Sequence, residues 1–106
     1  NKAEFFTFLK QHGVSEDKFE TEWKKFVTLF EIELLQQYFM TLPKEEQEKI
    51  GGLVKEKTDA NFFKYLSLLR SKMIPRINTL NLARMTDVAF ARAQKRYVEY
   101  LGVKEL

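Results

Sequence analysis

The feature that most constrains this fold is a long run of helical periodicity over residues 16–41. Aromatic and apolar residues recur along it at spacings of three and four, the pattern of one helix face: Phe19, Trp23, Phe26, Phe30 and Leu34. At 1.5 Å per residue, a helix of this length measures about 39 Å. A compact domain of this size has a radius of gyration of only about 13 Å. We therefore expect an elongated bundle, a bent helix or a helix that reaches a partner.

The rest of the chain also shows helical periodicity, because strict alternation of apolar and polar residues never persists. We expect four further helices, over about 3–12, 43–54, 59–74, and from a cap within 76–81 to 101. Gly13 and Gly102 are natural helix stops, since glycine adopts the left-handed conformation without steric cost. Gly51-Gly52 either breaks the third helix or lets its backbone pack closely against a neighbour. Pro75 either ends the fourth helix or kinks it.

These elements predict an all-α fold, a four- or five-helix and mostly antiparallel bundle in which the long second helix is central. We find no internal repeat, low-complexity tract or linker, so residues 1–106 are expected to form a single helical-bundle domain. Most of the ten Phe have core spacing. Phe6, Phe63 and Met40 lie off the main stripes and would form a patch for a partner if they were exposed together.

Composition excludes several kinds of site. The chain has no Cys, which rules out a disulfide scaffold, a Cys-ligated metal and a cysteine nucleophile. The single His, His12, lies on the apolar face of the first helix without a companion group, so we expect it to be structural. There is no Gly-rich phosphate loop. We therefore predict a protein that is not an enzyme, with no catalytic, cofactor-binding or metal-binding residues and no evident small-molecule substrate.

Two carboxylates, Glu31 and Glu33, lie in the most apolar part of the long helix. Their positions on a helical wheel are about 200° apart, so they cannot act as a catalytic pair on one face. Glu33 lies close to the stripe of Phe26 and Phe30, where a buried carboxylate needs a partner. We expect that partner to be a Lys or Arg from one of the last two helices.

Charge is distributed unevenly along the chain. Residues 1–69 carry ten Lys and twelve acidic residues, whereas residues 70–106 carry eight basic and three acidic residues, including all five Arg. A helical wheel places four basic residues of the last helix within about 120° of one another, away from its apolar side. Arginine suits carboxylate, phosphate and interface recognition. We predict a binding face of Arg76, Arg84, Arg92, Lys95 and Arg96, with an ordinary solvated face as the alternative.

The sequence favours a non-enzymatic helical interaction module, such as an adaptor, assembly subunit or regulatory protein, that binds a protein partner or itself as a homo-oligomer. Met85 and Val88 lie among the basic residues, which is more typical of a protein interface than of a nucleic-acid tract. The alternative is nucleic-acid- or ribosome-associated binding through the Arg-rich face. No apolar run approaches the roughly 18 residues of a membrane span. The absence of Cys fits a reducing compartment, so we expect a cytoplasmic protein.

Overall fold

The computed structural model describes residues 1–54 and 58–105, and within these ranges it contains helices and turns but no strand. The long second helix and the all-α fold are therefore confirmed. The elements in chain order are α1 (Lys2–Gln11), the 3₁₀ turn η1 (Glu16–Lys18), α2 (Phe19–Met40), α3 (Lys44–Gly52), α4 (Asp59–Met73), the 3₁₀ segment η2 (Ile74–Thr79) and α5 (Leu82–Glu105).

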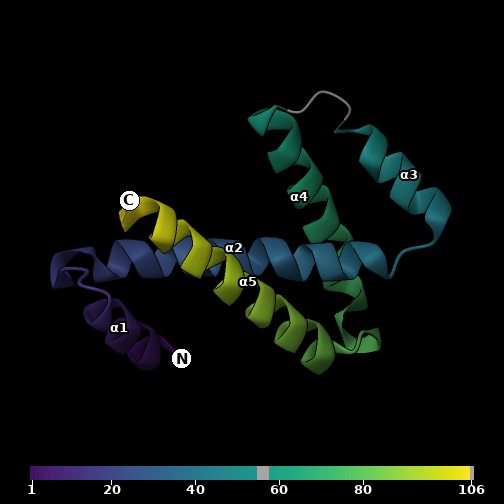
Figure 1. Ribbon diagram of the computed structural model, residues 1–106. Coiled ribbons are helices and arrows are strands. Elements are labelled where there is room, and N and C mark those ends of the chain that lie inside the picture. The colour runs from purple at the N-terminus through teal and green to yellow at the C-terminus, as the bar shows by residue number, and fades with distance from the viewer. Residues whose placement is uncertain (55–57, 106) are drawn as a thin grey trace.

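Helix α2 is the axis around which the other helices are arranged (Figure 1). In this view α5 crosses in front of α2 and runs in the opposite direction, while α4 passes behind it. Helix α1 folds back near the start of α2, and α3 leads away from its end. The molecule measures 46 × 32 × 18 Å and its radius of gyration is 15.9 Å. Of the three expectations for the long helix, the elongated bundle is the one that the structure shows.

Local sequence signals set most helix boundaries. Gly13 has a φ of +76°, the left-handed conformation that was expected to stop the first helix. The Thr58 side chain accepts a hydrogen bond from the backbone N–H of Asn61 at the start of α4. The Asn81 side chain does the same for the N–H of Arg84 at the start of α5.

Helices end near Gly52 and Pro75, as expected, but no helix ends at Gly102. Helix α3 ends at Gly52, and Pro75 lies in η2, where it separates α4 from α5 instead of kinking one helix. The prediction that the last helix stops at Gly102 is wrong, because α5 continues to Glu105. A glycine inside a helix costs about 1 kcal/mol relative to alanine. Leu101, immediately before Gly102, is buried, and its burial stabilises this part of the helix.

The buried apolar side chains form two clusters on either side of the crossing between α2 and α5. The first joins the end of α2 to α3, α4 and the start of α5, through Leu35, Tyr38, Leu42, Ile50, Tyr65, Leu66, Leu69, Met73 and Met85. The second joins the start of α2 to α1 and the later part of α5, through Leu9, Phe26, Ala93, Tyr97 and Leu101. Ala89 and Ala93 are fully buried, and their small side chains allow α5 to approach α2 closely, whereas Ala83 is exposed.

The close approach at the crossing gives a stability prediction. Ala93→Leu adds three heavy atoms at a fully buried position that packs with Phe26, so we expect the free energy of unfolding to fall by about 1–3 kcal/mol. Ala83→Leu, at an exposed position of the same helix, is the control and should change it by less than about 0.5 kcal/mol. Urea unfolding measures both, and equal effects would show that α5 does not pack through its alanines.

Candidate functional site

A buried carboxylate lies at the contact between α2 and α5. The side chain of Glu33 is only 1% exposed, and each of its oxygens faces an arginine of α5. The Arg92 Nε–H donates to Oε2 at 2.9 Å, and the Arg96 Nε lies 2.8 Å from Oε1. The expectation that a basic residue of a late helix would pair with Glu33 is therefore confirmed.

The two arginines border the buried side of α5. The helical wheel had instead placed them on the side that points away from it. The residues that α5 buries follow each other at a spacing of four, which advances the buried stripe around the helix by about 40° per step: Met85, Ala89, Ala93, Tyr97 and Leu101. Arg92 and Arg96 lie beside this rotating stripe and reach down to Glu33. Their side chains are still 60% and 53% exposed, respectively.

The other predicted binding residues do not join this cluster. Arg84 and Lys95 are exposed on α5, and Arg76 is exposed in η2. Within the described part of the chain, none of the three forms an ion pair. Arg70 of α4, the remaining arginine, donates from its Nε to Glu31 of α2 at 2.8 Å. The predicted binding face therefore contains two kinds of residue. Arg92 and Arg96 link α5 to α2 through Glu33, whereas Arg76, Arg84 and Lys95 are exposed and lie apart from one another.

Sequence reasoning missed a second buried carboxylate. Glu22 is 1% exposed, and Lys25 Nζ lies 3.1 Å from its Oε2. The same Nζ donates a hydrogen bond to the Tyr100 hydroxyl at 2.9 Å. The spacing of eleven residues between Glu22 and Glu33 was an available signal, because eleven residues make just over three full turns and place both carboxylates on one helix face.

This cluster changes the titration of two neighbouring groups. Burial raises the pKa of the Tyr97 hydroxyl, and the charge of Glu22 raises this pKa further. The pKa of Lys25 is also raised, first by its hydrogen bond with Tyr100 and then by that with Glu22. The arrangement holds Lys25 charged and Tyr97 neutral, which is the pattern of a structural ion pair.

An aromatic groove, with a volume of about 700 Å³, lies between α1 and α5 over the start of α2. Its apolar wall consists of Phe5, Phe8, Trp23, Phe26, Phe90, Tyr97 and Val98. Phe5 is the centre of the wall, with its ring 5.1 Å from the rings of Phe26 and Tyr97 and 5.4 Å from that of Trp23. Helix α1 therefore contacts α2 and part of α5 through its aromatic side chains, and the groove is the space beside these contacts.

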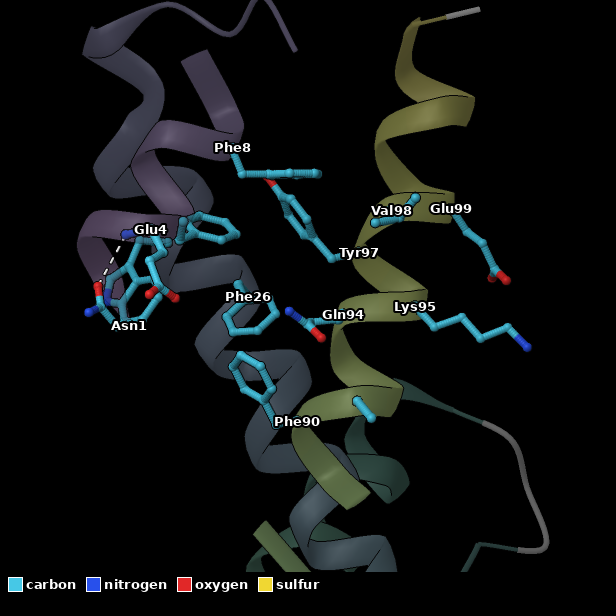
Figure 2. A pocket seen from close by; sticks show the side chains of 13 residues that line it. Asn1, Glu4, Phe8, Phe26, Phe90, Gln94, Lys95, Tyr97, Val98 and Glu99 are labelled. Carbon is cyan, nitrogen blue, oxygen red and sulfur yellow. Dashed lines mark hydrogen bonds between the residues drawn. The ribbon is translucent and has the colours of Figure 1, made fainter. Parts of the chain in front are cut away.

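Figure 2 shows how the groove is bounded. Phe26 of α2 and Phe90 of α5 face each other, with their ring centres 5.7 Å apart. Gln94 points inward from α5, whereas Lys95 and Glu99 extend outward at its edge. Val98 on the α5 wall is 51% exposed. The sequence placed most of these aromatic residues in a closed core, because helical spacing shows which side chains share a face but not whether another helix covers it.

The expected patch of Phe6, Phe63 and Met40 does not form as a unit. Phe6 packs on Phe19 at the first residue of α2, whereas Met40 is the last residue of that helix. The two positions are separated by the length of α2, about 32 Å. Phe63 and Met40 are exposed, and Phe6 is half-buried.

The described residues offer little else for chemistry. They contain no group of three or more His, Asp or Glu side chains placed to hold a metal ion. No helix in that part of the chain is long and apolar enough to cross a membrane. Comparison with family models, curated proteins and solved structures finds no match to this chain. Its function must therefore be argued from the groove and from the charged groups of α5.

The Glu22 cluster gives a prediction for alkaline pH. Above about pH 10 a tyrosine ionises in the unfolded chain, while Tyr97 in the folded protein keeps its proton. The unfolded state then binds fewer protons, so the free energy of unfolding falls as the pH rises. Urea unfolding between pH 9 and 11.5 should show this fall, and Tyr97→Phe should reduce its slope. Identical slopes for the two proteins would contradict the assignment.

Proposed function

We propose that this protein is a non-enzymatic helical interaction module whose aromatic groove binds one amphipathic helix of a partner protein. The single observation that carries the proposal is the groove itself, an apolar space of about 700 Å³ between two helices. An amphipathic helix that lays its apolar face into such a groove is a recurring mode of peptide recognition. Aromatic side chains are also the residues enriched at the centres of protein interfaces.

The shape of the groove favours a helix as the occupant. Helices α1 and α5 form its two walls and α2 its floor, so a fourth helix would complete the packing around the start of α2 (Figure 2). The apolar side chains of such a helix, at spacings of three and four, would contact Phe90 and Val98 on one side and Phe8 on the other. These contacts would cover the half-exposed apolar surface of Val98.

Charges at the edges of the groove define the partner further. Glu4 lies on the α1 edge, whereas the α5 edge carries Lys95 and, one turn further on, Glu99. A partner helix with a basic residue opposite Glu4 and an acidic residue opposite Lys95 would complement these two charges. Rim charges of this kind set orientation and association rate more than affinity.

Binding to a nucleic acid has less support. A phosphate backbone is bound by several free cations in a row. Glu33 balances one of the two charges of Arg92 and Arg96, and Glu31 balances that of Arg70, so this part of the surface carries a reduced positive charge. The residues of the predicted binding face that form no ion pair with a described residue, Arg76, Arg84 and Lys95, are separated along η2 and α5. We retain the cytoplasm as the proposed compartment, on the sole ground that a chain without Cys suits a reducing environment.

A designed peptide tests the proposal directly. We would label an amphipathic helical peptide that has a Leu/Phe stripe, Lys along one edge and Glu along the other, and measure fluorescence anisotropy. Val98→Glu places a charge in the groove wall and should weaken binding by at least about tenfold. The matched control is Val88→Glu on the same helix, which is exposed outside the groove and should leave binding unchanged.

Three outcomes would overturn the proposal. One is the absence of peptide binding at millimolar protein, and another is an equal loss of binding in the two valine variants. The third is a dimer of the protein, seen by light scattering, that Val98→Glu dissociates. In that case the occupant of the groove is a second copy of this chain and not a partner's helix.

A further inference from the structure

We propose that Arg92 and Arg96, held in place by Glu33, form a binding site for one carboxylate group of an acidic peptide segment. Neither arginine lines the aromatic groove, so this inference does not depend on the proposed function. The site is a second binding surface on α5, on the side of the helix where Arg92 and Arg96 pair with Glu33 of α2.

The geometry leaves both arginines with unused donors. Each approaches Glu33 through Nε, the nitrogen nearest the main chain, at 2.8–2.9 Å. Within the described part of the chain, their terminal Nη nitrogens donate no hydrogen bond. Because the Nε atoms of Arg92 and Arg96 lie within 2.9 Å of the two oxygens of one carboxylate, their guanidinium groups are neighbours. Both side chains remain more than half exposed, so the free N–H groups are accessible from solvent.

Glu33 also reduces the cost of binding. A free arginine side chain loses rotamer entropy when it is fixed by a ligand. Here the buried carboxylate of Glu33 already restricts both side chains and orients their planar guanidinium groups. A pair of guanidinium groups arranged in advance is the type of donor set that recognises planar oxyanions with two parallel hydrogen bonds.

The local charge favours a carboxylate over a phosphate. Two guanidinium groups and one ionised carboxylate leave a net charge of +1 on the cluster. A single carboxylate of charge −1 balances it, whereas a phosphate monoester carries a charge of about −1.5 to −2 and leaves an excess. The neighbours along the helix leave this balance unchanged, because Lys95, one turn after Arg92, and Glu99, one turn after Arg96, carry opposite charges.

The experiment follows the Nε–Hε resonances of the arginines in ¹⁵N-labelled protein by NMR. The probe is the peptide Ac-Ala-Glu-Ala-NH₂, and its uncharged match is Ac-Ala-Gln-Ala-NH₂, both added at constant ionic strength. We expect saturable shifts of Arg92 and Arg96 with the Glu peptide alone. Arg84, exposed on the same helix and in no ion pair with a described residue, should not shift and reports non-specific screening.

Lysine variants distinguish recognition by the planar guanidinium groups from attraction by positive charge alone. Arg92→Lys and Arg96→Lys keep the positive charge beside Glu33 but lose the planar donors, so each should weaken binding of the Glu peptide by about five- to tenfold. Arg84→Lys is the matched control and should leave it unchanged. The circular dichroism melting curves identify any variant that fails to fold, and the shifts of the wild-type protein test the proposal without any substitution.

Several results would overturn the inference. Shifts that grow linearly without saturation, or that appear equally with the Gln peptide, would show that no site exists. Equal shifts at Arg84 would show screening alone. Tighter binding of a phosphoserine peptide or of a short oligonucleotide than of the Glu peptide would assign the arginine pair to phosphate and contradict the carboxylate.

Discussion

The structure depends on how one charge is buried between two helices. A carboxylate removed from water costs several kcal/mol unless cations and hydrogen bonds replace the lost hydration. Glu33 is buried at the contact of α2 with α5, and both of its oxygens face arginines that α5 supplies one turn apart. A shift of α5 along α2 by one turn would replace one of the two arginines at Glu33 with Val88 or Tyr100. The ion cluster therefore fixes the register in which the two longest helices pack.

The two apolar clusters and the groove follow from that register. On one side of Glu33, the end of α2 packs with α3 and α4 into a closed core. On the other side, the start of α2 packs with α5 and with the ten-residue helix α1. This short helix covers only part of the aromatic surface that α2 and α5 present. The groove is the space that remains, and its position at this end of the molecule follows from the length of α1.

The sequence predicted those features that depend on neighbours along the chain. Helical spacing located the helices, and Gly13, Thr58 and Asn81 acted as the caps that their chemistry suggests. The need of a buried carboxylate for a cation also predicted a basic partner for Glu33. Features that depend on packing between helices were less accessible. The direction of Arg92 and Arg96 depends on the rotation of the buried stripe along α5, and the groove depends on where α1 ends.

The most direct test of this account is a thermodynamic cycle on Glu33 and its two arginines. Because either arginine alone still faces the carboxylate, Arg92→Met and Arg96→Met should each reduce the free energy of unfolding by about 1 kcal/mol. The double variant leaves Glu33 buried without a cation and should lose about 3–5 kcal/mol, more than the sum of the singles. Adding Glu33→Gln to the double variant should recover a large part of that loss. Additive losses with no recovery from Glu33→Gln would contradict the central role of this buried charge.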